Sequence, residues 1–357
     1  MKKIISISLL TFLLGCTHTD QLEENLSRTE IIDYIPASET QEPILETENA
    51  EDEVKISVAE EKTLYPPHSV GALLDAEIPG KDFTIGRVLA DNAVYTRHYI
   101  TYISDGLKIS GIMNVPKATT DDPGPWPVLF LNHGYIDPAV YTNGRGLKRE
   151  QDYFARNGYV VIHSDYRDHA QSDKNPVGRD KVGESGYTRD ILGGINAIKS
   201  LNPDFAHVNQ VGLLGHSMGG GVTMKAAVAR PEQIGAMALY APVSSDYKDN
   251  LLRWGMNRIL PSELEKIQDA GGQWDGELIA PYSAMTYFDR IEAPVMIHHG
   301  DRDADVPIQW SKDTLNRLTK AGKDVTYHEY PGEAHEYGPQ WQTFMQRNLD
   351  FFDQLLK

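Results

Sequence analysis

Short apolar runs alternate with stretches of helical spacing from about residue 97 to the end of the 357-residue chain. A continuous apolar run of four or five residues is typical of a strand buried on both faces in a parallel sheet. Strands are predicted at 97–104, 107–115, 128–131, 159–162, 211–214, 236–240, 294–298 and 325–330. Helices are predicted in the stretch that ends at 157, and at 187–201, 220–229, 308–321 and 340–356. This alternation indicates an α/β fold with a doubly wound, mainly parallel sheet that has helices on both faces.

The first two predicted strands form a hairpin. Residues 97–104 alternate between the two faces of a half-buried strand. Asp105 and Gly106 follow, and an Asp-Gly pair between two strands is a strong signal for a tight turn. Residues 107–115 return as the second strand, which Pro116 ends.

Residues 241–293 interrupt the alternation of strands and helices. Their aromatic side chains include Tyr247, Trp254, Trp274, Tyr282 and Tyr287. We expect a small helical cap insertion here, and most of these rings should form the core of the cap itself.

The first residues have the pattern of an export signal. Lys2 and Lys3 precede an apolar run at 4–14, which is too short to span a bilayer. Leu13, Leu14, Gly15 and Cys16 follow the pattern of a bacterial lipoprotein signal, so the resemblance implies a signal peptide at 1–15 and a lipid on Cys16. The alternative is an ordinary cleaved signal in which Cys16 is incidental. Cys16 is the one cysteine of the chain, so no intramolecular disulfide forms.

Charge is concentrated near the N-terminus. Residues 17–62 hold 14 acidic and 3 basic side chains and few aromatic ones, a composition that cannot bury a core. We therefore predict an acidic, disordered tether at 16–62, an N-terminal extension at 63–96 and a catalytic domain at 97–357. The whole chain has a net charge of −17, and nothing in it favours a nucleic-acid partner.

The candidate nucleophile is Ser217, in a G-x-S-x-G motif at 215–219. An apolar strand precedes the motif and a helical run follows it, as a nucleophile elbow requires. Glycines two residues on either side let the strand and helix approach closely, and the helix N-terminus favours negative charge. A chance match is the alternative, because five loosely constrained residues recur often.

A serine nucleophile needs a histidine base and a carboxylate partner for that base. In an α/β hydrolase these follow the serine in the order Asp then His, on loops at the carboxyl ends of strands. His335 lies on the last such loop, whereas His298, His299 and His328 lie in predicted strands and are expected to be structural. The preceding loop offers three acids, which spacing does not separate: Asp301, Asp303 and Asp305.

The same three aspartates invite comparison with a calcium loop. An EF-hand needs glycine at the sixth position and glutamate at the twelfth, where this chain has Val306 and Lys312. We therefore predict no metal site and no cofactor. For the oxyanion hole, the expected donors are the backbone N–H groups of Met218 and Tyr135, the second on the loop after the strand at 128–131.

These motifs together resemble the catalytic domain of the prolyl oligopeptidase (S9) family of α/β hydrolases, from about residue 97 to the C-terminus. The matching stretches are 104–111, 215–219, 294–307 and 330–335. The H-G-x-x-D-x-x-V-P pattern of the family begins at His299, so the resemblance selects Asp303 as the acid and His335 as the base. It also implies that the phenol of Tyr135 can donate. Residues 165–169 are similar to a D-Y-R-G-H segment of related esterases and lipases, with Asp168 in place of the glycine.

The resemblance implies a serine hydrolase, either an S9-like peptidase or a carboxylesterase, which acts on a small peptide or ester. Oligopeptidases of the family carry a large β-propeller before the catalytic domain, and none is expected here. The lipoprotein signal implies a location in the bacterial cell envelope, anchored to a membrane. The alternative function is an idle α/β-hydrolase body that serves as an envelope binding module.

Overall fold

The computed structural model describes residues 68–176, 179–255 and 279–357. The predicted signal peptide, Cys16, the whole acidic tether and the start of the extension lie outside these residues, so those predictions stay predictions. The strands of the described part are β1 (Gly80–Asp91), β2 (Tyr95–Ser104), β3 (Leu107–Pro116), β4 (Trp126–Asn132), β5 (Val160–Ser164), β6 (Ala206–His216), β7 (Ile234–Tyr240), β8 (Val295–Gly300) and β9 (Val325–Tyr330).

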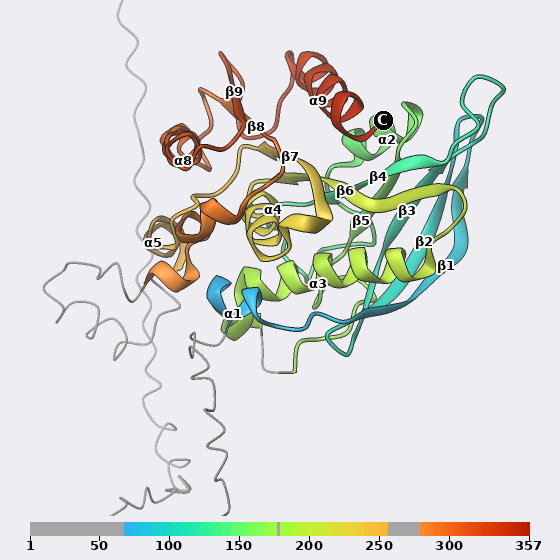
Figure 1. Ribbon diagram of the computed structural model, residues 1–357, viewed down its shortest axis with the longest axis horizontal. Coiled ribbons are helices and arrows are strands. Elements are labelled where there is room, and N and C mark those ends of the chain that lie inside the picture. Colours follow the sequence, from blue (N-terminus) through green and yellow to red (C-terminus); the bar gives the residue numbers. More distant parts are fainter. Residues whose placement is uncertain (1–67, 177–178, 256–278) are drawn as a thin grey trace, which may run out of the picture. The chain divides into compact units, whose positions relative to one another are not determined.

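These strands form one sheet in the order β1-β2-β3-β5-β4-β6-β7-β8-β9 (Figure 1). β1, β2, β3 and β5 pair antiparallel, and every pair from β5 to β9 is parallel. The predicted hairpin is present, with Asp105 and Gly106 at φ values of 53° and 80° in its turn. The predicted α/β-hydrolase fold, with its mainly parallel sheet, is thus confirmed.

The helices are α1 (Val70–Leu74), α2 (Lys148–Arg156), α3 (Arg179–Leu201), α4 (Met218–Ala229), α5 (Tyr247–Asn250), α8 (Ile308–Lys320) and α9 (Trp341–Leu356). Short helical turns are η1 (Pro231–Gln233), η2 (Leu251–Gly255), η4 (Ala280–Tyr282) and η5 (Ala284–Arg290). Figure 1 shows α2 and α9 on one side of the sheet and α1, α3 and α4 on the other.

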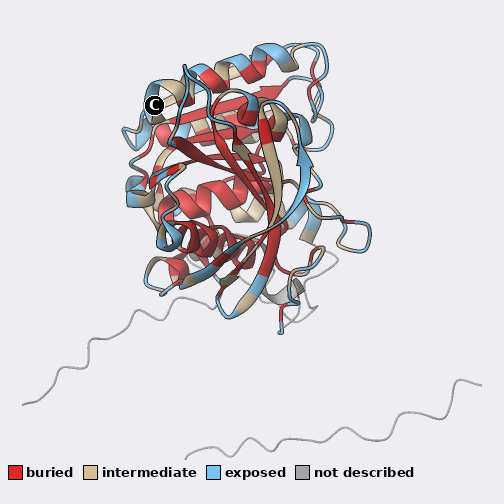
Figure 2. Ribbon diagram, turned by 90° about the vertical axis from the view of Figure 1, so that its right-hand side faces the viewer, coloured by how far each residue is buried: buried red, intermediate tan, exposed pale blue. Residues whose placement is uncertain are grey.

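Two hydrophobic cores fill the space between the helices and the sheet. Alternate residues of β7 divide between them: Met237 and Leu239 face the core with α3 and α4, and Ala238 and Tyr240 face the core with α9. This period of two is the reason why the central strands are apolar throughout. Figure 2 shows the central strands buried and the outer faces of the helices exposed.

The sequence did not reveal β1. This strand pairs with β2 at the edge of the sheet, and most of its residues are exposed or half-buried. An edge strand of this kind lacks the continuous apolar run that marks the central strands. Residues 80–91 of the predicted N-terminal extension therefore belong to the same sheet as the domain that follows.

The predicted cap insertion is described only at its two ends, and residues 256–278 lie outside the described part. The first end contains α5 and η2, and the second contains η4 and η5. Arg253 donates to the backbone carbonyl oxygens of Ala304 and Asp305, at 2.9 and 2.8 Å. The first end of the insertion is thus tied to the loop after β8. No helix among the described residues has the length and apolar character that crossing a membrane requires.

Candidate active site

Ser217 lies in the sharp turn between β6 and α4, with φ of 56° and ψ of −121°. A positive φ is uncommon for a residue other than glycine, and it marks a strained turn. A Cβ atom on Gly215 would collide with the backbone oxygen of Gly219, and one on Gly219 would collide with that of Asn132. Both glycines of the predicted motif are therefore required by close approach of the backbone.

Backbone hydrogen bonds hold this turn in place. The N–H of Ser217 donates to the carbonyl oxygen of Tyr240 at 2.9 Å. The carbonyl oxygen of Ser217 accepts from the N–H groups of Gly220 and Val243, at 2.9 and 3.1 Å. Because β7, the segment after it and α4 together satisfy both backbone polar groups of Ser217, the unusual conformation is built into the structure around it.

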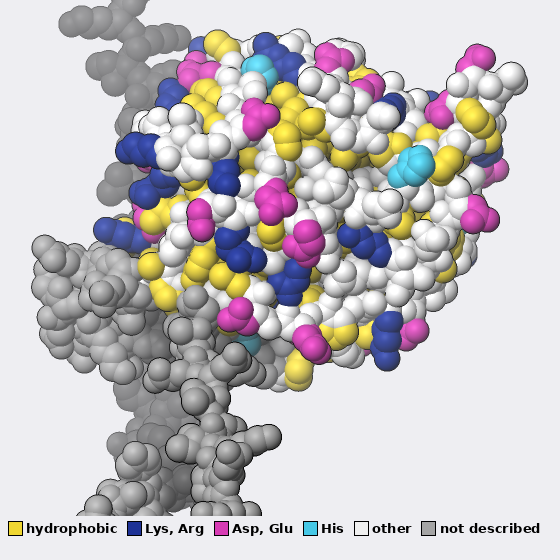
Figure 3. Space-filling view, viewed as in Figure 1, with side chains coloured by type: hydrophobic (Ala, Val, Ile, Leu, Met, Phe, Trp, Pro, Cys, Tyr) yellow, Lys and Arg dark blue, Asp and Glu magenta, His cyan; other side chains and the backbone are white. Residues whose placement is uncertain are grey.

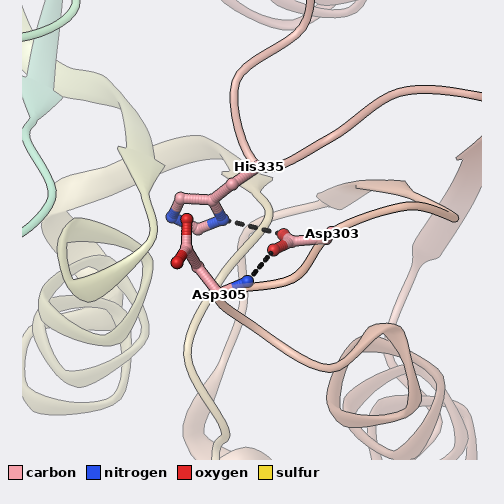
Figure 4. Close-up of side chains that lie close together, drawn as sticks. All are labelled: Asp303, Asp305 and His335. Carbon is pink, nitrogen blue, oxygen red and sulfur yellow. Dashed lines mark hydrogen bonds and ion pairs between the residues drawn. The ribbon is translucent and has the colours of Figure 1, made fainter. Parts of the chain in front are cut away.

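His335 and Asp303 meet at the same edge of the sheet, on the loops after β9 and β8 (Figure 4). His335 Nδ1 lies 2.7 Å from Asp303 Oδ2. The Asp303 side chain is completely buried, and the His335 side chain is 16% exposed. A carboxylate only accepts, so Nδ1 carries the proton and Nε2 of His335 is left as an acceptor.

Further hydrogen bonds converge on Asp303. His299 Nε2 lies 3.1 Å from the same oxygen that His335 contacts, and the N–H groups of Asp305 and Val306 donate to Oδ1 at 2.9 and 2.8 Å. Burial alone would raise the pKa of Asp303, but the hydrogen bonds from His299, His335 and Val306 outweigh it. They hold the pKa of this carboxyl well below its usual range, so Asp303 stays ionised.

The other two candidate acids have different surroundings. Asp301 is exposed, and its Oδ1 accepts from the N–H of Gly332 at 2.6 Å. Asp305 is also exposed, although ligand atoms of Asp303, Asp305 and His335 lie within 4.8 Å of one another. This trio could hold a metal ion, but an ion there would compete with the proton that joins His335 to Asp303.

Ser217 and His335 line one pocket of about 430 Å³. The other lining residues are His133, Gly134, Tyr135, Ile136, Arg145, Gly146, Leu147, Lys148, Arg149, Glu150, His216, Tyr240 and Glu336. His298, His299 and His328 are not among them. His298 is buried, with Nδ1 2.8 Å from the hydroxyl of Tyr330, and its ring stacks on that of His328.

The predicted oxyanion donors lie at this pocket. Met218 is the first residue of α4, so its N–H has no partner within the helix. A Cβ atom on Gly134 would come within 3.0 Å of the Cβ of Ser217, so the loop after β4 passes directly beside the serine. The next residue, Tyr135, also lines the pocket, and it is 55% exposed.

The segment at 165–169 supports the loop that forms one wall of the pocket. The buried carboxylate of Asp165 accepts from the N–H of Gly144 at 2.8 Å and from Asn143 Nδ2 at 2.7 Å. Gln151 Nε2 donates to the carbonyl oxygen of Gly146 at 2.6 Å. Asp168 has φ of 68°, which is the conformation that a glycine at this place would adopt freely.

Sequence reasoning missed one histidine of the site, His216. Its ring centre lies 4.5 Å from that of His335, and its Nε2–H donates to the backbone oxygen of His335 at 3.1 Å. Burial, followed by the charge of His335, lowers the pKa of His216 to about 3. This neutral ring therefore fixes the backbone of His335. The only sequence signal was its place beside Ser217, which does not show what it contacts.

The sequence profile of the prolyl oligopeptidase family (Peptidase_S9) matches residues 145–357. A monoacylglycerol lipase of Mycolicibacterium smegmatis is 24% identical over 259 residues, which are 64% of this chain and 88% of the lipase. An uncharacterized peptidase of Bacillus subtilis, YtmA, is 25% identical over 255 residues, which are 70% of this chain and 90% of that protein.

Solved structures share the fold. An acylaminoacyl peptidase in complex with Z-Gly-Gly-Phe-chloromethyl ketone aligns with a TM-score of 0.59 and 21% identity. The alignment covers 74% of this chain and 42% of the peptidase, so the chain spans less than half of that protein. Acetyl xylan esterase 1 from Thermoanaerobacterium aligns with a TM-score of 0.58 and 17% identity, over 79% of this chain and 91% of the esterase.

Proposed function

Because the chain belongs to the prolyl oligopeptidase family of α/β hydrolases, we propose that it is a serine hydrolase with Ser217, Asp303 and His335 as its catalytic triad. One observation carries the proposal. His335, hydrogen-bonded through Nδ1 to a buried carboxylate at 2.7 Å, lines the same pocket as a serine on a strained elbow. A protein that only binds ligands would need none of these three features.

The proposed reaction has two stages. Ser217 Oγ attacks the carbonyl carbon of the substrate while His335 Nε2 takes the hydroxyl proton. His335 then gives this proton to the leaving alcohol or amine as its bond to the carbonyl carbon breaks, which leaves an acyl-enzyme. Water, activated by the same nitrogen, attacks the acyl-enzyme and releases the acid. Asp303 keeps the imidazole in the correct tautomer and stabilises its charged form.

The oxyanion that forms in both stages would accept from the backbone N–H groups of Met218 and Tyr135. Substitution of Tyr135 by phenylalanine separates a backbone role from a phenol role, because it removes only the hydroxyl. If the backbone alone donates, Tyr135→Phe retains most of the wild-type kcat. If the phenol also donates, kcat falls by about 10²-fold, as for the loss of other oxyanion donors.

The substrate is proposed to be a small ester or peptide. The two relatives described above carry the names of a lipase and a peptidase, and ester and amide cleavage share the same triad. The test is a hydrolysis panel that compares p-nitrophenyl esters of increasing acyl length with aminoacyl and dipeptidyl anilides. Faster cleavage of the anilides would indicate a peptidase, and cleavage of the esters alone would indicate a carboxylesterase.

We also propose that the mature chain begins at Cys16 and is held at a membrane of the bacterial cell envelope by lipid on that residue. The basic pair Lys2 and Lys3 and the apolar run at 4–14 support this proposal. The acidic stretch at 17–62 would then separate the hydrolase from the bilayer, because its like charges repel and extend the chain.

A further inference from the structure

One wall of the pocket carries a cluster of positive charge. Arg145, Lys148 and Arg149, which we call the cationic wall, line the same pocket as Ser217 and His335. All three are exposed. They lie where the loop after β4 enters α2, so they flank the serine although they are about seventy positions before it in the sequence. The positive charge that these side chains give the pocket depends on how far neighbouring carboxylates neutralise them.

Arg149 is the member whose charge is partly satisfied. Its Nη2 donates to the backbone oxygen of Tyr337 at 2.9 Å, and its guanidinium lies 4.9 Å from the ring centre of Trp341. The adjacent Glu150 is buried and lies 3.9 Å from this guanidinium. Burial raises the pKa of Glu150, and the indole N–H of Trp341 already occupies one of its oxygens at 2.7 Å. The contacts of Glu150 are thus with Trp341 and Arg149, and it forms no ion pair with Arg145 or Lys148 within the described part of the chain.

No carboxylate of the described residues forms an ion pair with Arg145 or Lys148. Arg145 Nη1 donates to the backbone oxygen of Val140 at 2.6 Å, and the other guanidinium nitrogens of Arg145 have no hydrogen-bond partner among the described residues. The ammonium group of Lys148 makes no hydrogen bond or ion pair within the described part of the chain. One exposed carboxylate, that of Glu336, also lines the pocket. The lining thus contains more exposed positive than negative side chains.

This excess is unusual for the molecule. Residues 63–357 have a net charge of −8, and Figure 3 shows positive and negative side chains interspersed on the face drawn there. The backbone adds to the effect, because α2 begins at Lys148 and the side chain of the preceding residue, Leu147, does not cap its first N–H groups. A concave site lined by one sign of charge concentrates ligands of the opposite sign.

The wall is also held in position before any ligand arrives. The carbonyl oxygen of Gly146 accepts from Gln151 Nε2 at 2.6 Å, and His163 Nε2 lies 3.1 Å from it. Together with the hydrogen bonds of Asp165 to Asn143 and Gly144, these contacts fix the backbone that carries Arg145 and Lys148. A fixed backbone reduces the ordering that a bound ligand would otherwise have to impose.

We propose that this pocket selects esters or amides that carry a carboxylate group, and that Arg145 and Lys148 bind that carboxylate. The inference rests on the proposed serine hydrolase function and names its class of substrate. Arg145 supplies a planar fork that suits a carboxylate, and Lys148 supplies a point charge beside it. The carboxylate takes no part in bond making, so it raises the affinity and orients the carbonyl carbon toward Ser217.

The test uses two pairs of esters, in each of which one member carries a free carboxylate and the other carries the methyl ester of that carboxylate. In the first pair, mono-p-nitrophenyl glutarate carries a carboxylate in its acyl group, and its methyl ester is the neutral partner. In the second pair, 4-acetoxybenzoate carries the carboxylate in its leaving group, against methyl 4-acetoxybenzoate. We expect wild type to prefer the charged member of at least one pair by about tenfold in kcat/KM, from two exposed charge contacts. A preference in the first pair would place the cationic wall on the acyl side of the scissile bond, and a preference in the second pair would place it on the leaving-group side.

The double variant Arg145→Gln/Lys148→Gln should lose this preference, mainly through a higher KM for the charged ester. Lys320→Gln, an exposed lysine on α8 outside the pocket, is the matched control and should keep it. Wild type gives a second readout that needs no variant: between 20 and 500 mM NaCl, KM should rise for the charged ester and stay constant for the neutral one.

Two results would overturn the inference alone. One is a wild type that hydrolyses both members of each pair equally well or prefers the neutral ones. The other is a double variant that retains the preference for charge. If wild type hydrolysed none of the four esters and did not react with a fluorophosphonate, the serine hydrolase proposal itself would fail, and the carboxylate claim with it.

Discussion

Two loops of the site, one after β8 and one after β4, are built differently. The acid loop after β8 buries the side chain of Asp303, whose oxygens take part in four hydrogen bonds, with His299, His335 and two backbone N–H groups. The cationic wall after β4 holds its backbone as firmly, but it leaves the side chains of Arg145 and Lys148 in solvent. In the proposed function, the chemistry depends on a buried, fully paired group, and the selectivity depends on exposed charges.

This difference predicts how each loop responds to mutation. Removal of one partner from a buried charged network leaves another group unpaired, which is costly. Removal of an exposed charge costs only a screened interaction with the ligand.

The largest effect is expected from Asp303→Asn. The amide offers His335 a donor in place of an acceptor, so the imidazole loses its correct tautomer, and kcat should fall by about 10⁴-fold. Asp301→Asn and Asp305→Asn are matched controls in the same loop, and both should retain most of the activity. Steady-state kinetics on an activated ester provides the measurement. A loss of this size in either control, with Asp303→Asn active, would show that the acid is assigned to the wrong residue.

A smaller effect is expected from His299→Leu, which removes one of the two imidazoles that contact Asp303 Oδ2. His299 is a positioning residue, because it acts through Asp303 and lines no part of the pocket. We expect kcat to fall by about tenfold with KM unchanged, and stability to fall by about 1–3 kcal/mol from the lost buried hydrogen bond. Unchanged kcat in a destabilised variant would mean that His299 supports only the fold.

The buried His216 makes a prediction about stability and pH. The folded state holds its pKa at about 3, below the unfolded value of 6.5, so the unfolded chain binds more protons between these two values. The free energy of unfolding should therefore decrease as the pH is lowered through this window, by about 1.4 kcal/mol per unit from this residue. The glutamine of His216→Gln does not titrate. In urea unfolding at pH 4.5 and 6.5, the free energy of unfolding of this variant should therefore change less with pH than that of wild type. The same change in both proteins would contradict the assignment.

Cys16→Ser should leave catalysis unchanged and alter only location. Several acyl chains on one residue give lasting attachment at about 0.8 kcal/mol for each buried methylene group. We expect wild type in the membrane fraction and an equally active Cys16→Ser form in the soluble fraction of expressing cells. Wild type that is soluble, or a variant that remains in membranes, would remove the anchoring proposal and leave the catalytic one intact.

The comparison also explains what the sequence could predict. Strand, turn and helix around Ser217 are local in sequence, so the elbow and its glycines follow from pattern alone. Spacing left Asp301, Asp303 and Asp305 equal, and only the resemblance selected Asp303, which is the one that contacts His335. The sequence could therefore predict Asp303 as the acid, because the residues of its loop form a recognisable motif.

Other features depend on contacts between distant segments. Lys148 precedes Ser217 by more than sixty positions, and no periodicity reveals that both line one pocket. The contact of His216 with His335 likewise joins the end of β6 to the loop after β9. β1 was missed for a different reason, because an exposed edge strand has little apolar pattern to detect.

Reaction of the intact protein with a fluorophosphonate, which forms a covalent bond only with an activated serine, tests directly whether Ser217 is a nucleophile. We predict stoichiometric labelling of wild type, with the adduct located by peptide mass spectrometry on Ser217. Ser217→Ala should fold normally, take up no label, and lose ester hydrolysis by at least about 10⁴-fold. A wild-type protein that does not react, or a Ser217→Ala variant that is labelled as strongly as wild type, would contradict the account.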